Sequence, residues 1–463
     1  MSNRPKFHII TFGCQMNQND SERISSLLNN LGFDSTTDKT KADIILLNTC
    51  SVRQSAEDRI YGNVRNLAKL KRKNPNLIIA VTGCMPGRDR DGALRKKLPA
   101  VDLFFPTTDA VQLPRWIAEL RPELVNNIDV ADDFLKLKPD YYSKRQAFVT
   151  IQTGCNNFCT YCVVPFARGL EKNRPLKDIM SEVRELAQNG CVEITLLGQT
   201  VNSYIAPDSE NFSKGNPFKD HFAVLLWEVN QIEGISRLHF TAPHPMHMSD
   251  EVIEAMKLPA HMNVLHLPVQ SGDNEVLRKM NRRYSAEDYL EVIGRVKKQL
   301  PGITLATDII VGFCGESEEQ FQRTVDLYKQ VEFDISYTAQ YSVRSGTAAW
   351  RAFTNDVPRT EKKRRWQSMQ KLMEEITLKK NQEYVGKEVS VLVERHEVPA
   401  LTGEMLKLPK DLQDKALAHS GFCFGNSREL KLVRFEGGPE LVGQIVNVKI
   451  DKAQTWVLLG SKK

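Results

Sequence analysis

The feature that most constrains how this chain can fold is a pattern near its N-terminus, in which a short apolar run leads to a cysteine three times. The runs and their cysteines are residues 7–13 with Cys14, 43–49 with Cys50, and 77–83 with Cys84. Helix-like stretches at 20–31 and 55–72 separate them, and a fourth apolar run lies at 101–105. Alternating strands and helices predict a doubly wound parallel sheet, in which ligand sites gather outside the carboxyl ends of the strands. We therefore expect these three cysteines, the N-terminal trio, to converge at one sheet edge.

The number and spacing of the cysteines indicate what this edge could hold. Cys14, Cys50 and Cys84 lie 36 and 34 residues apart, so they repeat one structural position. The chain has nine cysteines and starts without an extended apolar segment and cleavage site, so we expect a cytoplasmic protein without a disulfide framework. Metal or redox chemistry is the leading explanation, and three unrelated buried cysteines are the alternative.

Length, composition and charge limit the class of protein to which this chain can belong. The chain has 463 residues, of which 41% are hydrophobic and 26% charged, values that favour a folded protein of about three domains. Its apolar runs fall short of the roughly 20 residues of a membrane span, so we expect no membrane insertion. The formal net charge of +6 permits a nucleic acid partner without requiring one.

A second alternation of strands and helices follows a polar stretch that we interpret as a linker. Six strand-like runs lie at residues 148–153, 192–197, 237–241, 264–267, 304–311 and 335–341. Helical segments lie between them, at residues 176–188, 222–232, 286–300 and 318–331, with a surface insertion at 206–220. Six such units predict a partial (β/α)6 barrel with its site in the loops at the strand C-termini. The predicted organisation is residues 1–130, a linker at 131–146, the barrel at 147–383 and a last domain at 384–463.

The C-terminal part no longer alternates between strands and helices. Residues 359–383 form a helix candidate with eight Lys or Arg against four Glu, which fits either phosphate contacts or a solvated face. Short runs parted by glycine-rich turns follow, at residues 388–393, 429–434, 444–449 and 455–459. These predict a small all-β barrel. The expected fold class is therefore α/β, with an all-β domain at the C-terminus.

The most informative motif is a C-x3-C-x2-C loop directly after the first predicted barrel strand. Its cysteines are Cys155, Cys159 and Cys162, here called the loop trio. Thiolates favour iron–sulfur clusters and zinc, and both centres normally take four protein ligands. With three ligands, a four-iron cluster keeps one iron open to a small molecule. A zinc site or an accidental spacing is the alternative.

This loop resembles the signature of the radical S-adenosylmethionine superfamily. The resemblance implies a catalytic [4Fe-4S] cluster on the loop trio, whose free iron binds the amino and carboxylate groups of S-adenosylmethionine. After receiving an electron, such a cluster cleaves S-adenosylmethionine to a 5′-deoxyadenosyl radical. Tyr161 occupies the aromatic position that the superfamily uses beside the adenine.

Further segments resemble the methylthiotransferase family within that superfamily. They read FGCQMNQNDSE, NTCSVRQSAEDRIYG, VTGCMPG, GCNNFCTYCVVPFARG, LLGQTVNSY, HPMHMSDEV, LHLPVQSG and TDIIVGFCGE, and they span nearly the whole chain. The resemblance implies that the N-terminal trio holds a second [4Fe-4S] cluster with an open position, so that one cluster makes the radical and the other presents sulfur. Both clusters then face one cavity.

Two of these segments, GCQMN and NTCSVR, are most similar to the branch that adds a methylthio group to carbon 2 of N(6)-dimethylallyladenosine at position 37 of tRNA. Methylthiotransferases that act on threonylcarbamoyl-adenosine or on a ribosomal protein are the enzymatic alternatives. A non-catalytic iron–sulfur electron carrier is the third. FARG after the loop trio, and Cys314 where the family usually has proline, depart from the family pattern.

Polar residues at predicted strand ends are candidates for binding S-adenosylmethionine. Gln199 and Asn202 follow the second barrel strand, where the superfamily grips the methionine end of the cofactor. His244, Gln270 and Asp308 end the next three strand regions. For each of them, a loop cap or an ordinary hydrogen-bond partner is the alternative.

The expected macromolecular partner is the anticodon stem-loop of tRNA, because an unpaired loop gives up a base more cheaply than a helix does. The segment FCFGNSRELKLVRFEG resembles the TRAM module, an RNA-binding β-barrel. Lys431 and Arg434, together with the basic helix, are predicted to grip RNA. Arg428 is a weaker candidate, and Arg168 is assigned either a carboxylate or phosphate contact or a structural salt bridge. We also expect an electron donor protein of unknown identity, and a monomer.

Three cysteines remain outside these motifs. Cys191, Cys314 and Cys423 have no cysteine partner nearby in sequence and are predicted to be packing residues.

Overall fold

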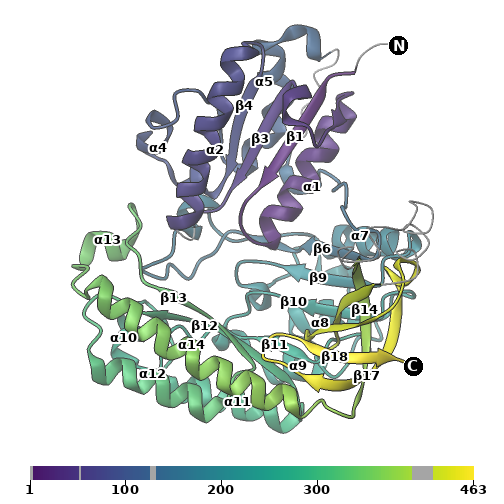
Figure 1. Cartoon of the computed structure of the whole chain (residues 1–463), viewed down its shortest axis with the longest axis vertical. Helices are drawn as coiled ribbons and strands as arrows, with labels where there is room; N and C mark the ends of the chain where they lie inside the picture. Colours follow the sequence, from purple (N-terminus) through teal and green to yellow (C-terminus); the bar gives the residue numbers. More distant parts are fainter. Residues whose placement is uncertain (1–3, 52–53, 126–131, 399–420) are drawn as a thin grey trace, which may run out of the picture.

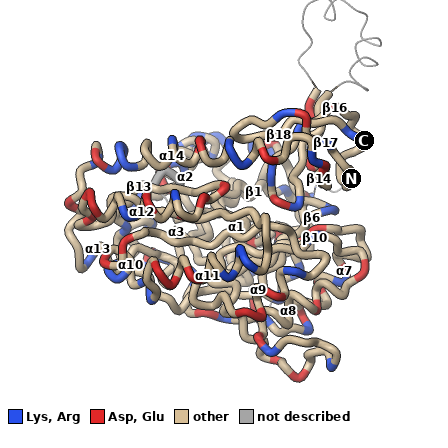
Figure 2. The backbone as a smooth tube through the Cα atoms, turned by 90° about the horizontal axis from the view of Figure 1, so that it is seen from below, with Lys and Arg blue, Asp and Glu red and all other residues tan. Residues whose placement is uncertain are grey.

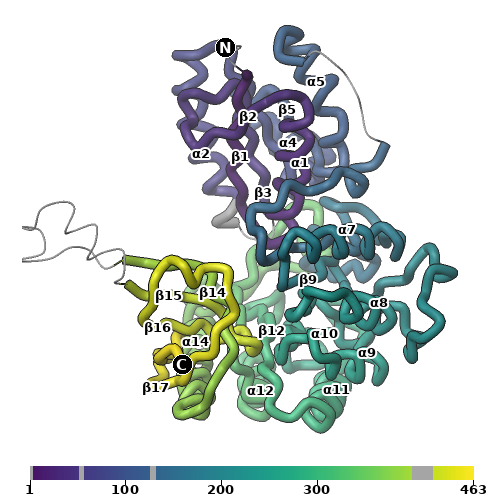
Figure 3. The backbone as a smooth tube through the Cα atoms, turned by 90° about the vertical axis from the view of Figure 1, so that its right-hand side faces the viewer, coloured from purple at the N-terminus to yellow at the C-terminus, as the bar shows by residue number. Residues whose placement is uncertain are grey.

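The computed structural model of this chain describes residues 4–51, 54–125, 132–398 and 421–463. In Figure 1 an N-terminal sheet with its helices lies above a larger central unit, and a small β-barrel lies beside that unit. Figure 3 shows the same three parts from the side, with the C-terminal barrel against the flank of the central unit. None of the helices in the described ranges is both long enough and apolar enough to cross a membrane.

The N-terminal sheet is parallel and has the order β2-β1-β3-β4-β5. Its strands are β1 Lys6–Thr11, β2 Asp34–Ser35, β3 Ile44–Thr49, β4 Ile78–Gly83 and β5 Leu103–Phe104. Its helices are α1 Gln15–Asn30, α2 Gln54–Lys73, α3 Cys84–Arg88, α4 Ala93–Lys96 and α5 Leu113–Leu120.

Side chains of β3 alternate between two separate cores. Ile44 and Leu46 pack with residues of α1 and α5, whereas Ile45 and Leu47 pack with residues of α2. A strand that is buried on both faces reads as a continuous apolar run, which is the pattern of this segment. Helices therefore cover both faces, and the predicted doubly wound sheet is confirmed.

The central unit is a six-stranded partial barrel, as predicted. Its strands are β6 Gln146–Thr150, β9 Glu193–Leu197, β10 Arg237–Phe240, β11 Val264–His266, β12 Thr304–Val311 and β13 Ile335–Gln340. They form two parallel sheets of three strands, β10-β9-β6 and β11-β12-β13, which one bridge between Leu238 and His261 joins. No pairing joins β13 to β6 in the described part of the chain, so the barrel is open there.

Helices and a short hairpin complete the central unit. The helices are α6 Val164–Ala167, α7 Leu176–Gln188, α8 His221–Asn230, α9 Asp250–Ala255, α10 Asn274–Lys279, α11 Ala286–Gln299, α12 Glu318–Val331, α13 Ala348–Ala352 and α14 Arg359–Gln382. The antiparallel pair β7 Gln152–Thr153 and β8 Lys172–Asn173 brackets the loop trio in sequence. α11 and α12 each begin with a reciprocal capping box, at Ser285 and Ser317.

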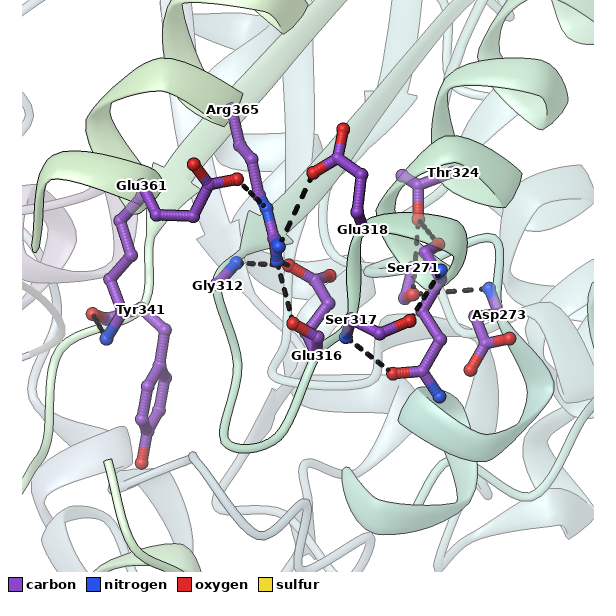
Figure 4. A network of polar contacts seen from close by, with 12 residues as sticks. Ser271, Asp273, Gly312, Glu316, Ser317, Glu318, Thr324, Tyr341, Glu361 and Arg365 are labelled. Carbon is purple, nitrogen blue, oxygen red and sulfur yellow. Dashed lines mark hydrogen bonds and ion pairs between the residues drawn. The ribbon is translucent and has the colours of Figure 1, made fainter. Parts of the chain in front are cut away.

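The turn after β12 fixes α14 on the barrel. The buried carboxylate of Glu316 accepts hydrogen bonds from the amide of Gly312, at 2.5 Å, and from Nη1 of Arg365, at 2.7 Å (Figure 4). Arg365 Nε also donates to Glu361 on its own helix, at 2.8 Å. Because a buried charge is tolerated only when it is paired, this network orients α14 rather than an external ligand.

Most other basic residues of α14 are also paired within the protein. The pairs are Lys362 with the carbonyl of Tyr341, Arg364 with Glu318 and Glu361, Lys379 with Glu332, and Lys380 with Asp334. Basic and acidic residues alternate along this helix in Figure 2. Because these charges are already paired, they argue against the interpretation of the helix as a phosphate-contacting element.

The C-terminal domain is a closed barrel with the strand order β14-β15-β16-β18-β17. Its strands are β14 Glu388–Glu397, β15 Phe422–Ser427, β16 Leu432–Glu436, β17 Ile445–Ala453 and β18 Leu458–Lys462. Val391, Val433 and Phe435 are among the residues of its core. The predicted all-β barrel is confirmed.

Arginine side chains hold this domain against the central barrel by donating to main-chain carbonyls. Arg145 Nε donates to Gly443 O at 2.6 Å, and Arg237 Nη2 donates to Ser427 O at 2.9 Å. Arg428 reaches in the opposite direction and donates to the carbonyls of Ser236, Pro259 and His261. These bonds form a clamp between the two barrels.

Hydrogen bonds hold the predicted linker and the predicted surface insertion against the rest of the protein. The first residue of the predicted linker lies outside the described ranges. Further along the linker, the carbonyls of Leu135 and Leu137 accept hydrogen bonds from Arg23 of α1. In the predicted insertion, the Asp208 carboxylate accepts from the amide of Leu176 at 2.6 Å, while Glu228 accepts from the hydroxyl of Ser213 at 2.8 Å. Buried hydrogen bonds therefore hold both segments in defined positions.

Candidate active site

The N-terminal trio lies at the carboxyl ends of three neighbouring strands. Cys14 follows β1 and caps α1, Cys50 follows β3, and Cys84 begins α3 directly after β4. Gly13 has φ +129°, and a Cβ there would lie 2.8 Å from the Cβ of Cys50. The chain therefore needs glycine before Cys14 to bring the first two strand ends this close. Convergence of the trio at one sheet edge agrees with its predicted placement.

An arginine from the central barrel reaches the N-terminal trio. Arg168 follows α6, is buried, and donates from Nη2 to the Asp20 carboxylate at 2.6 Å. Burial raises the pKa of the Cys84 thiol, and the positive charge of Arg168 opposes that shift. Of its sequence-based interpretations, the geometry supports the structural salt bridge, because the guanidinium is buried and paired with a carboxylate of the N-terminal domain.

The loop trio is surrounded by N–H donors. The Val164 amide donates to Cys162 Sγ at 3.4 Å, Asn157 Nδ2 to Cys155 Sγ at 3.6 Å, and Arg282 Nη1 to Cys159 Sγ at 3.3 Å. Donors directed at sulfur stabilise thiolates and tune the clusters that thiolates hold. Arg282 lies more than a hundred residues downstream, and no sequence pattern pointed to it.

The chemistry of each trio fits an iron–sulfur cluster. Burial, and then the neighbouring Cys159 thiol, raise the pKa of Cys162 to about 12, so the three thiols are crowded and require cations to ionise together. Among the described residues, no three Cys, His, Asp or Glu side chains converge on a point for one metal ion. A cluster does not need that convergence, because each thiolate binds a different iron atom.

Two short helices bring the trios together. α3 begins at Cys84, α6 begins two residues after Cys162, and the two helices pack directly on each other. A Cβ at Gly87 of α3 would overlap the carbonyl oxygen of Ala167, so this glycine permits the close approach. Arg90 adds a cation–π contact, 5.4 Å from the ring centroid of Phe166.

A cavity of about 450 Å³, here called the first cavity, opens beside the loop trio. The predicted residues that line it are Tyr161, Cys162, Gln270 and Asp308. Gln270 has φ +71°, and its amide donates to Asp308 O at 2.9 Å, so an uncommon backbone conformation is held by the neighbouring strand. Gln270 follows β11, as predicted, whereas Asp308 lies within β12, three residues before its end, and still lines the first cavity.

The other residues that line the first cavity were not predicted, among them Tyr337, Tyr341, Arg344 and Trp366. Arg344 comes from the central barrel, and its Nη1 lies 3.7 Å from the Glu57 carboxylate of the N-terminal domain. Burial lowers the pKa of Arg344, whereas Glu57 and Cys50 both act to raise it. This arginine therefore lines the first cavity and also lies within electrostatic reach of the N-terminal trio.

The remaining candidate cofactor ligands are placed differently. Asn202 Nδ2 donates to His244 O at 3.0 Å, and the His244 amide donates back to Asn202 Oδ1 at 2.7 Å. Burial lowers the pKa of His244 to about 2, so its ring is neutral. Gln199 is partly exposed after β9. These three residues do not line the first cavity, and their contact with a cofactor stays a prediction.

The predicted RNA contacts in the C-terminal domain are not supported at two of three positions. Arg428 is part of the clamp, and Lys431 is buried with its Nζ 2.7 Å from the Asp334 carboxylate. Arg434 is partly exposed and stacks on Phe422, with 4.6 Å from its guanidinium carbon to the ring centroid. Its contact with RNA stays a prediction.

No disulfide joins the nine cysteines, which all lie in the described part of the chain, and the three outside the trios are buried. Cys191 donates weakly to Glu193 O at 3.3 Å, Cys423 lies in the core of the C-terminal barrel, and Cys314 packs in a small apolar cluster. These positions agree with the predicted packing roles.

Comparisons with protein families match three parts of the chain. Residues 6–106 match the family described as Uncharacterized protein family UPF0004, residues 149–328 the Radical SAM superfamily, and residues 413–463 the TRAM domain. Solved structures agree with the fold of the central part. The radical S-adenosylmethionine methyltransferase TsrM from Kitasatospora setae, with cobalamin and a [4Fe-4S] cluster bound, has a TM-score of 0.54 at 12% identity, covering 75% of this chain and 74% of its own.

Curated relatives cover almost the whole chain. The tRNA-2-methylthio-N(6)-dimethylallyladenosine synthase of Clostridium botulinum strain Langeland is 42% identical, covering 99% of this chain and 97% of the relative. The synthase of the same name from Clostridium tetani is 42% identical, with 98% and 96% covered, and that of Caldicellulosiruptor saccharolyticus is 41% identical, with 98% and 92% covered. At this identity and coverage, the chain belongs to the MiaB-type tRNA-2-methylthio-N(6)-dimethylallyladenosine synthase family of radical S-adenosylmethionine enzymes.

Proposed function

We propose that this protein adds a methylthio group to carbon 2 of N(6)-dimethylallyladenosine at position 37 of tRNA, using S-adenosylmethionine and two [4Fe-4S] clusters. The observation that carries the proposal is that helices α3 and α6, which begin at or just after one cysteine of each trio, pack on each other, while Cys162 of the loop trio lines the first cavity. The chain is also 42% identical to a curated synthase of this activity. The TRAM match supports tRNA as the substrate.

The loop trio holds one cluster and the N-terminal trio holds the second. When bound, the first supplies the electron that splits S-adenosylmethionine, and the second supplies an open iron for sulfur. Arg282 donates to Cys159 Sγ and stabilises the ligand as a thiolate. Arg168 places a fixed positive charge beside Cys84.

The residues of the first cavity orient what enters it. Gln270, Asp308 and Arg344 offer polar groups, and Tyr337, Tyr341 and Trp366 offer ring faces against which purines pack. Trp366 is fixed because its Nε1 donates to Thr338 O at 3.0 Å. RNA bound over the mouth of the first cavity would keep water away from a reactive carbon radical.

The test is a reaction with the anaerobically reconstituted protein, S-adenosylmethionine, a chemical reductant and a dimethylallylated anticodon stem-loop. We expect 2-methylthio-N(6)-dimethylallyladenosine by nucleoside mass spectrometry, together with 5′-deoxyadenosine. Product on a stem-loop with threonylcarbamoyl-adenosine, or on a ribosomal protein, in place of this substrate would overturn the assignment. An electron carrier would form no 5′-deoxyadenosine at all.

The proposal includes a cellular location, an oligomeric state and an electron donor. The enzyme acts in the cytoplasm as a monomer and takes its electron from a partner protein. Nine cysteines without a disulfide among the described residues are consistent with a reducing compartment. Light scattering of the reconstituted protein checks the monomer, and fractionated cell extract in place of the chemical reductant checks the donor.

A further inference from the structure

A second cavity, of about 270 Å³, lies where the C-terminal barrel meets the central barrel. Strands β10 to β13 and helix α14 form one side of it, and residues 429–432 and 455–456 form the other. Gln15, the neighbour of Cys14, also lines it. This second cavity therefore extends from the C-terminal domain toward the N-terminal trio.

The two cavities share a wall. Tyr337 lines both of them, and its ring centroid lies 5.5 Å from that of His266, which lines the second cavity. His266 Nε2 in turn lies 3.4 Å from the carboxylate of Asp308, which lines the first cavity. A chain with one unit in the first cavity can therefore place the adjacent unit in the second.

Four buried polar side-chain atoms of the second cavity have no hydrogen-bond partner: Asn381 Oδ1, Glu429 Oε2, Thr304 Oγ1 and His266 Nε2. Two of them can only accept, namely Oδ1 of Asn381, a residue that is 3% exposed, and Oε2 of the Glu429 carboxylate. Asn381 cannot turn away, because its Nδ2 donates to Gln454 O at 2.9 Å and to Thr455 O at 3.0 Å. An unsatisfied buried acceptor is unfavourable, so both atoms call for a donor from a ligand.

The same two bonds fix the turn that carries Trp456. This tryptophan lines the second cavity and is 49% exposed, although large aromatic side chains are normally buried. Its free ring face suits a planar partner, and stacking on aromatic rings is how proteins hold unpaired bases.

Charge in the second cavity selects against phosphate. The Glu429 carboxylate would repel it, and the Lys431 ammonium group is already bonded to Asp334 at 2.7 Å. Acceptors beside an aromatic face fit the amino edge of adenine, cytosine or guanine.

We propose that the second cavity is a nucleobase subsite, which holds an unpaired nucleotide next to the target adenosine by stacking on Trp456 and by amino-group hydrogen bonds to Asn381 and Glu429. This proposal rests on the proposed function. It assigns the C-terminal domain a part in presenting the target base to the first cavity.

The test couples a protein change to an RNA change. Binding of a dimethylallylated anticodon stem-loop is measured by fluorescence anisotropy for the reconstituted protein and for Trp456→Ala, with each neighbour of the target in turn replaced by an abasic unit. We expect Trp456→Ala to raise the Kd about tenfold for the intact stem-loop, because one stacked base is lost. At one neighbouring position, the abasic unit should weaken wild type by a similar factor and leave Trp456→Ala almost unchanged.

Matched variants control for folding. Trp456→Phe keeps a ring and should restore most of the affinity. Trp350→Ala removes an equally exposed tryptophan, at 50%, from α13 and should leave the Kd unchanged. The proposal is wrong if the fold changes in Kd caused by the abasic unit and by Trp456→Ala multiply when the two are combined. It is also wrong if Trp456→Ala leaves the Kd unchanged. If wild type binds the stem-loop but makes no methylthio product, the proposed function fails instead.

Discussion

The two cysteine trios are built in opposite ways. The loop trio lies within eight consecutive residues, and its positions are set by one loop, a short hairpin and donors such as Asn157 and Arg282. The N-terminal trio comes from three strands that only the folded sheet brings together. A local site survives damage elsewhere in its domain, whereas a site assembled from strand ends depends on every strand that contributes to it.

Removing one cysteine from each trio has the largest expected effect. Cys155→Ala and Cys14→Ala should each abolish methylthiolation, and each should lower iron from about eight atoms to about four, since each leaves one four-iron cluster. Cys155→Ala should also abolish cleavage of S-adenosylmethionine, whereas Cys14→Ala should retain it. Iron and sulfide analysis and 5′-deoxyadenosine quantification check this. Equal loss of cleavage in the two variants would contradict the separation of roles.

Glycine substitutions test the local and the assembled site separately. Gly154 and Gly83 have φ of +75° and +100°, and a Cβ at either would overlap a carbonyl oxygen, that of Leu170 or that of Thr49. Gly154→Ala should lose only the cluster of the loop trio. Gly83→Ala should lose the other cluster and also destabilise the N-terminal sheet by about 3 kcal/mol, because Thr49 pairs with Gly83.

The control for this pair is Gly92→Ala. Gly92 also has a positive φ, +70°, but open space around it, so about 1 kcal/mol and no iron should be lost. Denaturant unfolding and iron content measure all three variants. A Gly83→Ala protein as stable as Gly92→Ala would refute the argument.

Gly87→Ala tests the junction between the trios. Its new methyl group would push α3 away from α6, so methylthiolation should fall about tenfold to a hundredfold while both clusters and cleavage of S-adenosylmethionine remain. Gly62→Ala is the matched control, since a Cβ at Gly62 of α2 meets nothing within 4 Å. Coupled assays of product and 5′-deoxyadenosine separate the two activities, and a parallel fall in both would argue against a positioning effect.

A buried carboxyl group of the N-terminal domain should make the stability of the protein depend on pH. Burial raises the pKa of Glu22 from its ordinary value of 4.5 to about 7. The folded protein therefore holds this proton more tightly than the unfolded chain does. Stability should fall as pH rises from about 4.5 to about 7, by up to about 3 kcal/mol. Glu22→Gln should flatten this slope, measured by unfolding of the cluster-free protein at several pH values; superimposable profiles would contradict it.

Sequence patterns predicted both trios because each has a local signal. The loop trio has its own spacing, and each cysteine of the N-terminal trio ends an apolar run. The runs before Cys50 and Cys84 are buried on both faces. The parallel sheet and the partial barrel also follow from alternation of elements. Gln270 was found because residues after strand ends line such barrels, and Asp308 was found by the same argument although it lies within β12.

Contacts between domains had no such signal. Arg344 and Gly87 matter through partners far away in the chain, and charge alone does not tell whether Lys431 or Arg428 is free or paired across an interface. The strand predicted at residues 429–434 begins later, at Leu432, because Leu430 has φ +54° in a tight turn. Apolar and polar pattern cannot report a left-handed backbone at a leucine.

The clamp between the two barrels has an evolutionary consequence. Arg145, Arg237 and Arg428 donate to main-chain carbonyls, and every amino acid offers the same carbonyl group. Mutations that alter side chains on the outer strands of the C-terminal barrel therefore leave its attachment intact. The surface of this domain can therefore change during evolution to bind another tRNA while the contact between the two barrels stays the same.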